Sequence, residues 1–332
     1  MKIGILGATG AVGRQMLECI EERNIACEEI RLFASERSLG KTLKYKGQDI
    51  ALQVADENTL AGLDYVLGAV SNAMSKFYRP MIKAAGAVYI DNSSAFRLEE
   101  DVPLVVPEIN GEDALKHNGL IANPNCSTII TYMALAPISK LSPLTKVSAT
   151  TYQAVSGAGI NGFHELSSQV KALEEGEPIE AKVFPMQIAY NCIAEIGSYL
   201  DNGYTTEEMK MQNEGRKIMH LPDLKVTCTC VRVPVFRSHS ISVVFETEKP
   251  VSIEDAEKAV AGFQGDVLVK DHVPNPLETS NQDLVHVGRI RKDLTSENGL
   301  VLWCCGDQIR KGAAANAVSI MEYVDLHKCD RI

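Results

Sequence analysis

The chain has 332 residues, of which 45% are hydrophobic and 23% charged, a composition typical of globular proteins and a length sufficient for two domains. Lys and Arg total 33 against 43 Asp and Glu, and no Lys/Arg-rich block occurs, which excludes nucleic acid as an expected partner. No segment reaches the roughly 18 consecutive apolar residues of a membrane span. We therefore expect a cytoplasmic protein that does not bind membranes.

The first third of the chain alternates short apolar runs with helical patterns. Residues 3–6 end in a glycine-rich turn, and helical spacing follows to residue 20. Further strands are predicted at 29–35, 63–70 and 87–93, with a helix at 80–87. Short strands alternating with helices predict a parallel α/β sheet that is covered on both faces.

From about residue 147 the pattern changes to longer strands rich in Thr and Val that are not each followed by a helix. These strands are predicted at 146–155, 224–235, 239–247 and 299–309, and a more helical stretch at 162–219. They indicate a second, α+β domain with a mixed sheet.

The last helical pattern, at 312–324, has no sheet partner nearby in the sequence, so we expect it to return to the first domain. The predicted domains are 1–125 completed by 312–332, and 126–311.

Nine cysteines, an odd number without a secretory signal, make a disulfide framework improbable. The tightest clusters, Cys228-x-Cys230 and Cys304-Cys305, lack the spacing of a zinc site, so no metal is expected. We interpret both clusters as buried thiols in strand interiors.

A glycine-rich turn, Gly7-Ala-Thr-Gly10-Ala-Val-Gly13, joins the first strand to the first helix. Glycines in this context allow a tight turn and a close approach of the backbone to a pyrophosphate. The spacing is G-x-x-G-x-x-G instead of G-x-G-x-x-G, so a glycine turn without a ligand remains an alternative. The favoured interpretation is a Rossmann-type dinucleotide-binding domain.

The end of the second predicted strand carries Ser35, Arg37 and Ser38, one planar cation and two hydroxyls that suit a 2′-phosphate. Glu36 is the counter-argument, because a carboxylate would serve a ribose 2′-hydroxyl. NADP is therefore favoured over NAD as the cofactor.

Cys126 is the candidate nucleophile among the nine cysteines. It lies at the start of an apolar helical pattern, where the helix N-terminus favours the thiolate, and polar residues flank it. A thiol nucleophile needs a base, and His239 alone of the seven histidines lies in a polar turn rich in functional groups. A structural role for either residue remains open at this point.

Taken together, several motifs closely resemble the aspartate-semialdehyde dehydrogenase family, with features of its bacterial branch, from Gly4 to about Val324. The motifs are GATGAVG, ASERSLG, NSSAFR, NPNCSTI, TYQAVSGAG, FPMQIAYN, EEMKMQNEGRKI, CVRVPVFRSHS and GAAANAV. The resemblance implies reversible reductive dephosphorylation of L-aspartyl 4-phosphate by NADPH to L-aspartate 4-semialdehyde and phosphate, in the biosynthesis of lysine (through diaminopimelate), threonine, methionine and isoleucine. It also implies a homodimer or homotetramer.

The resemblance further assigns roles by matching position. Cys126 would form a thioester, His239 would be the acid/base and Gln153 would orient the intermediate. In the substrate site, Arg232 would bind the α-carboxylate and Glu214 the ammonium, with Arg97 and Lys217 at the phosphoryl group. The positions matched to the cofactor are Gly7, Thr9, Gly10, Ala11, Val12, Gly13, Ser35, Arg37, Ser38, Ser156, Gly157 and Asn316.

Without the resemblance, Glu214 and Lys217 would be interpreted as a surface ion pair, Arg97 as a surface arginine and Asn316 as a helix-packing residue. Three other functions remain as alternatives: an N-acetyl-glutamyl-phosphate reductase, a cysteine acyltransferase or hydrolase, and a catalytically silent NADP-binding sensor. Glu214 discriminates against the first, because a free ammonium needs a carboxylate and an amide does not. Arg37 argues against the second, and retention of Cys126, Gln153, Arg232 and His239 against the third.

Overall fold

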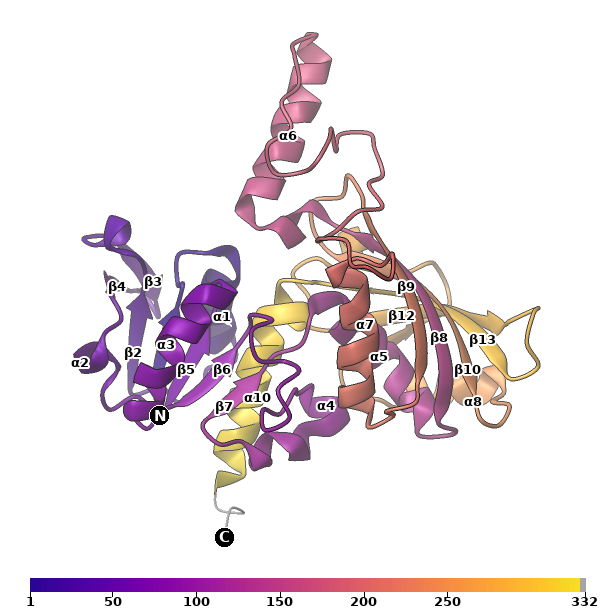
Figure 1. Cartoon of the computed structure of the whole chain (residues 1–332), viewed down its shortest axis with the longest axis horizontal. Coiled ribbons are helices and arrows are strands. Elements are labelled where there is room, and N and C mark those ends of the chain that lie inside the picture. Colours follow the sequence, from indigo (N-terminus) through magenta and orange to yellow (C-terminus); the bar gives the residue numbers. More distant parts are fainter. Residues whose placement is uncertain (329–332) are drawn as a thin grey trace. The chain divides into compact units, whose positions relative to one another are not determined.

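The computed structural model describes residues 1–328, and it divides into two compact units (Figure 1). The first unit comprises Met1–Asn125 and the C-terminal stretch from Ala313, and the second comprises Cys126–Gly312. Residues 329–332, which include Cys329 and the end of the predicted first domain, lie outside the described residues. Each unit is built on its own sheet.

The sheet of the first unit has seven strands in the order β3-β4-β2-β1-β5-β6-β7. Its strands are β1 (Lys2–Leu6), β2 (Glu29–Phe33), β3 (Thr42–Tyr45), β4 (Gln48–Gln53), β5 (Tyr65–Gly68), β6 (Val88–Asp91) and β7 (Leu120–Ala122). β1 runs parallel to both of its neighbours, β2 and β5, so the order of the strands reverses at β1. The predicted parallel sheet is confirmed except at its edge, where β3 runs antiparallel to β4.

Helices cover both faces of this sheet. They are α1 (Ala11–Glu22), α2 (Glu57–Leu60), α3 (Asn72–Ala84), α4 (Pro107–Asn110) and α10 (Ala315–Leu326), with the 3-10 helices η1 (Glu36–Ser38) and η2 (Gly111–Lys116). α1 and α10 share a core with Ile90 of β6. The neighbouring Tyr89 points to the opposite face, where its hydroxyl lies 2.8 Å from Ser75 Oγ of α3.

The helix predicted at 80–87 is wrong in its bounds. The structure begins this helix at Asn72 and carries it through Pro80 to Ala84. Ser71 Oγ accepts a hydrogen bond from Met74 N at the helix start, so the chain already has its N-cap nine residues before the proline. The proline is typical of a helix start, but here it lies inside the helix.

The second unit has a six-stranded sheet in the order β11-β12-β13-β10-β8-β9. Its strands are β8 (Leu144–Gln153), β9 (Lys225–Arg232), β10 (His239–Thr247), β11 (Asp266–Val269), β12 (Val285–Lys292) and β13 (Gly299–Gly306). β8 and β9 are parallel, as are β11 and β12, whereas β10 is antiparallel to both β8 and β13. The predicted mixed sheet is therefore confirmed.

Three helices of this unit, α5, α7 and α8, pack against the sheet (Figure 1). The helices are α5 (Cys126–Ser139), α6 (Ile160–Glu175), α7 (Thr206–Met219), α8 (Ile253–Ala261) and α9 (Pro276–Thr279), with the 3-10 helix η3 (Val155–Ala158) and the π-helix η4 (Arg310–Ala314). Residues 176–205 form no helix in the described structure, so the helical prediction for 162–219 is right only near its two ends. Among residues 1–328, no helix combines the length and apolar character that crossing a membrane requires.

The strand register brings four strand ends together at one end of this sheet. Gln153, the last residue of β8, pairs with Arg232, the last residue of β9. His239, the first residue of β10, pairs with Gly306, the last residue of β13. Because β10 runs antiparallel to β8 and β13, its beginning lies beside their ends.

The eight cysteines among the described residues are all free. Cys228 and Cys230 are buried in β9, and Cys304 and Cys305 are buried in β13, which confirms their interpretation as thiols in strand interiors.

Candidate active site

The thiol of Cys126 lies beside the imidazole of His239. Cys126 is the first residue of α5, and its Sγ is 3.5 Å from His239 Nε2, although the two residues are 113 positions apart. The predicted nucleophile and the predicted base are therefore in contact.

A backbone donor orients the His239 ring. Ala154, which follows directly after β8, donates its N–H to His239 Nδ1 at 3.1 Å. An acceptor Nδ1 carries no proton, so in the neutral ring the proton is on Nε2 and faces the Cys126 sulfur. His239 is fully buried, and burial together with the charge of Arg232 lowers its pKa to about 3, so the ring is neutral at physiological pH.

Gln153 is held by two acceptors. Its Nε2 donates to Ser127 Oγ at 2.7 Å and to Glu207 Oε1 at 3.4 Å. A carboxylate only accepts hydrogen bonds, so Glu207 determines which end of the buried amide faces it.

The guanidinium of Arg232 is buried and oriented by the protein backbone. Its Nη1 donates to Ala154 O at 2.7 Å, so Ala154 contacts both Arg232 and His239. Burial lowers the pKa of Arg232, but an arginine remains charged at any physiological pH. Because a buried cation is costly unless an anion meets it, this position suits a carboxylate ligand.

Glu214 and Lys217 lie on α7, and their burial differs. Glu214 is only 2% exposed and lies among the buried residues of this helix, whereas Lys217 is half-buried. A surface ion pair is therefore the wrong interpretation of Glu214. Gly215 permits this burial, because a Cβ there would lie 2.1 Å from the Tyr132 ring of α5.

Two glycines make room for the reactive side chains. A Cβ on Gly312 would lie 2.8 Å from Cys126 Cβ, and one on Gly157 would lie 2.7 Å from Arg232 Nη1. Both distances are shorter than van der Waals contact, so larger residues would displace Cys126 or Arg232.

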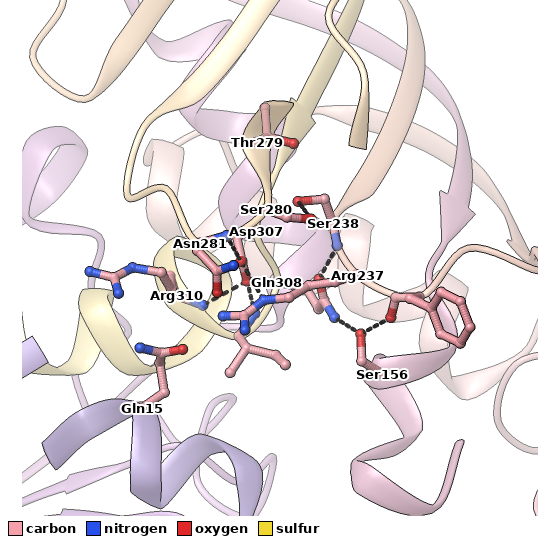
Figure 2. A network of polar contacts seen from close by, with 12 residues as sticks. Gln15, Ser156, Arg237, Ser238, Thr279, Ser280, Asn281, Asp307, Gln308 and Arg310 are labelled. Carbon is pink, nitrogen blue, oxygen red and sulfur yellow. Dashed lines mark hydrogen bonds and ion pairs between the residues drawn. The ribbon is translucent and has the colours of Figure 1, made fainter. Parts of the chain in front are cut away.

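Ser156, beside Gly157 in η3, is buried in a polar network (Figure 2). Its Oγ donates to Phe236 O and accepts from Gln308 Nε2. Gln308 Oε1 also accepts from Ser238 N at 2.8 Å, which joins η3 to the turn that precedes His239.

In the first unit, the glycine turn lies between β1 and α1, where the order of the strands reverses. Gly7 has a φ of +76°, and a Cβ there would lie 2.3 Å from Ala69 O. A Cβ on Gly13 would lie 2.3 Å from Gly7 O. Gly10 is the N-cap of α1 and supplies no capping side chain. These features fit a dinucleotide pyrophosphate, which binds at a helix N-terminus at such a switch point.

The other predicted cofactor positions of the first unit, apart from Asn316, lie in this turn, at the start of α1 or just after β2. Thr9, Ala11 and Val12 are partly exposed. Ser35 and Arg37 are exposed just after β2, and Ser38 is partly exposed.

Arg97 and Asn316 are both buried in the first unit. Arg97 donates from Nε to Asn123 O and from Nη2 to Asn92 O, both at 2.9 Å, so an ordinary surface arginine is the wrong interpretation. Asn316 donates from Nδ2 to Val105 O at 3.0 Å and to Asn123 Oδ1 at 2.7 Å. These bonds give Asn316 a packing role, which is compatible with cofactor binding.

Sequence reasoning missed Glu207 and the residues around Gln308. Thr205 and Glu208 form a capping box that begins α7, and this signal was available to place Glu207 in the first turn of a helix. No local signal relates that turn to Gln153, which comes from a different strand.

Comparison with known proteins identifies the family. Residues 2–117 match the model described as "Semialdehyde dehydrogenase, NAD binding domain", and residues 135–311 match "Semialdehyde dehydrogenase, dimerisation domain". The chain is 46% identical over 326 residues to aspartate-semialdehyde dehydrogenase from Synechocystis sp., covering 97% of this chain and 96% of that protein. The chain belongs to the aspartate-semialdehyde dehydrogenase family.

Other members of the aspartate-semialdehyde dehydrogenase family give the same result. The Bacillus subtilis protein is 44% identical over 334 residues, with 97% and 96% of the two chains covered. A crystal structure of aspartate semialdehyde dehydrogenase II from Vibrio cholerae complexed with ASA superposes with a TM-score of 0.95 at 41% identity and covers 98% of each chain. The matched domains support NAD(P) binding and self-association.

The burial of His239 predicts a pH-dependent stability. Its folded pKa of about 3 lies below the unfolded value near 6.5, so between these values the unfolded state binds more protons and stability falls as pH falls. The cost is about 1.4 kcal/mol per pH unit below 6.5. Between pH 6.5 and 5, the free energy of unfolding of His239→Gln in urea should therefore fall by about 1.6 kcal/mol less than that of the wild type.

His164→Gln, which changes an exposed histidine, is the control and should follow the wild-type profile. An identical loss in wild type and His239→Gln would show that His239 does not stay neutral in the folded protein.

Proposed function

We propose that this chain catalyses the reversible reductive dephosphorylation of L-aspartyl 4-phosphate to L-aspartate 4-semialdehyde and phosphate, with NADPH as the reductant. The observation that carries the proposal is the 3.5 Å contact between Cys126 Sγ and His239 Nε2, in a chain of this family. The relative whose structure is complexed with ASA supports the substrate.

In this mechanism the Cys126 thiolate attacks the acyl carbon, the bond to phosphate breaks, and an aspartyl thioester remains on the sulfur. The nicotinamide cofactor, when bound, supplies the hydride that reduces this thioester. Collapse of the resulting thiohemiacetal breaks the C–S bond and returns the thiolate with the aldehyde.

His239 acts through the proton on Nε2. The Ala154 N–H occupies Nδ1, so the ring stabilises the thiolate and the oxyanions of the tetrahedral intermediates by donating from Nε2, without first becoming an imidazolium. We thus narrow the predicted acid/base role of His239 to hydrogen-bond donation from Nε2. Gln153, held by Ser127 and Glu207, orients the intermediate.

Charged groups at the end of β9 and on α7 match a small zwitterion. Arg232 binds the α-carboxylate, and the buried carboxylate of Glu214 binds the ammonium. This pairing favours a free amino acid over an N-acetylated substrate. Lys217 and Arg97 bind the phosphoryl group, and the carbonyl acceptors Asn123 O and Asn92 O hold the Arg97 guanidinium in a fixed orientation for that role.

The glycine turn with Thr9 to Val12 holds the pyrophosphate, and Ser35, Arg37 and Ser38 hold the 2′-phosphate of NADP. Ser156, Gly157 and Asn316 complete the cofactor site, with Asn316 at its nicotinamide end. We place this chemistry in the cytoplasm, because the reaction needs a reduced thiol.

Self-association is proposed through the sheet of the second unit. α5, α7 and α8 pack against one face, while side chains on the other face remain partly exposed, among them Val244 and Trp303. A β-sheet face of this kind is suited to packing against another sheet. The strands that form it lie within residues 135–311, which match the dimerisation domain. The partner is a second copy, giving a homodimer or a homotetramer.

Trapping the acyl-enzyme tests the reaction. Incubation with L-aspartate 4-semialdehyde and NADP+ without phosphate should leave an aspartyl group on Cys126, because nothing is present to release the thioester except water. Peptide mass spectrometry should find the adduct there and not on Cys228, and Cys126→Ala should abolish turnover. An adduct on another cysteine would contradict the proposed nucleophile.

Arg37→Ala tests cofactor choice. Loss of a charge-assisted hydrogen bond of about 1.5–3 kcal/mol should raise the KM for NADP+ about tenfold or more and leave the KM for NAD+ nearly unchanged. Lys44→Ala, an exposed lysine on β3, is the control and should leave both values unchanged. Equal losses for both cofactors would mean that Arg37 has only a structural role.

Val244→Lys tests the interface. A charge on the uncovered sheet face should shift the protein toward monomers in sedimentation equilibrium, since a buried lysine without a partner is costly. Leu294→Lys, at a loop position that is 98% exposed, should sediment as wild type does. A wild-type protein that is monomeric at micromolar concentration would refute the proposed association.

A further inference from the structure

Asp307 is a buried carboxylate that contacts four donors directly after β13 (Figure 2). Its Oδ1 accepts from Ile309 N at 2.8 Å and from Arg310 N at 3.0 Å. Its Oδ2 accepts from Arg237 Nε at 2.6 Å and from Asn281 N at 2.7 Å. A buried charge is strongly destabilising unless it is paired and hydrogen-bonded, and here both requirements are met.

One pair of these contacts leads to His239. Arg237 lies two residues before it, and the intervening Ser238 has a φ of +72°. A residue other than glycine adopts this left-handed conformation only where its surroundings enforce it. Asp307 holds Arg237, and Gln308 accepts from Ser238 N at 2.8 Å, so both residues that precede the imidazole are tied to the end of β13.

The other contacts lead to Cys126. The Oδ1 bonds organise the start of η4, and the backbone oxygen of Asp307 accepts from Gly312 N at 2.9 Å. Gly312 lies against Cys126 so closely that a Cβ would be 3.1 Å from Cys126 Cα. The same residue therefore contacts the supports of both the thiol and the imidazole.

We propose that Asp307 is a positioning residue that sets the contact between Cys126 Sγ and His239 Nε2. It acts through Arg237 and through the η4 turn, without touching the substrate. This inference rests on the reaction proposed for Cys126. Its test therefore also includes the reactivity of the thiol itself, which needs no substrate.

Asp307→Asn keeps the size of the side chain and removes its charge. We expect kcat to fall by about tenfold to a hundredfold, as for a small misplacement of reacting groups, with each KM changed by less than about threefold. Alkylation of Cys126 by iodoacetamide at pH 7 should slow by about fivefold or more, because the thiolate loses its aligned Nε2–H donor. Peptide mass spectrometry assigns the alkylation to Cys126.

Asp283→Asn is the matched control. The Asp283 carboxylate accepts from Arg310 Nε at 2.6 Å beside the same turn, but its side chain is 30% exposed. This variant should retain kcat and the alkylation rate within about twofold, as expected for a partly exposed ion pair.

Arg237→Gln separates positioning from folding. It should reproduce the slower alkylation, and combining it with Asp307→Asn should add little, since the two residues act as one unit. If Asp307→Asn does not fold, the alkylation rate of Cys126 in Arg237→Gln tests the proposal by itself. Wild-type alkylation in these variants, or a loss confined to KM, would overturn the inference. If wild type does not convert the semialdehyde but Asp307→Asn still slows alkylation, the proposed reaction fails and the positioning role stands.

Discussion

The contact between the Cys126 thiol and the His239 imidazole is the constraint on which the second unit depends. It requires the first residue of α5 to meet the first residue of β10, and the sheet register makes this possible by placing the start of β10 beside the ends of β8 and β13. The Ala154 N–H then fixes which ring nitrogen faces the sulfur. One end of one sheet thus supplies the imidazole, the backbone group that orients it and the buried guanidinium of Arg232.

The chemistry of the site follows from burial as much as from residue type. A solvated histidine would be largely charged in mildly acidic solution, whereas burial and the neighbouring Arg232 keep His239 neutral. Burial has a different effect on Glu214 and Arg232. A buried charge is costly unless it is paired, so these two charges suit the ammonium and the carboxylate of an amino acid. The low dielectric constant of the buried site also strengthens the electrostatic interaction of each group with a bound ligand.

Local patterns predicted the parts of the molecule that depend on neighbours in the sequence. Three such features were predicted correctly: the turn with Gly7, the helix start at Cys126 and the alternation of strands and helices in the first unit. They were predictable because glycine conformation and hydrophobic spacing are local properties. The hairpin of β3 and β4 was missed, although its turn residues, Lys46 and Gly47, both have positive φ as a two-residue hairpin requires. The start of the helix around Pro80 was predicted wrongly. Proline is typical of the first turn of a helix, but in this structure Pro80 lies in the interior of α3.

The parts that depend on distant segments were not predictable from the residues alone. Glu207 and Asp307 resemble any acidic residue in a helix turn or a loop, and only the fold brings them to Gln153 and Arg237. The burial of Glu214 likewise depends on the approach of α7 to α5 at Gly215. The family resemblance supplied roles for Gln153 and Arg232, but not the groups that hold them.

The most direct test of the account is the reduction of NADP+ by the wild-type protein with L-aspartate 4-semialdehyde, measured with and without phosphate and repeated with N-acetyl-L-glutamate 5-semialdehyde. The account predicts sustained, phosphate-dependent formation of NADPH with the aspartate compound and little with the acetylated one, because the proposal pairs the buried Glu214 carboxylate with a free ammonium. Phosphate-dependent reduction with the acetylated compound alone, or none with either, would contradict it.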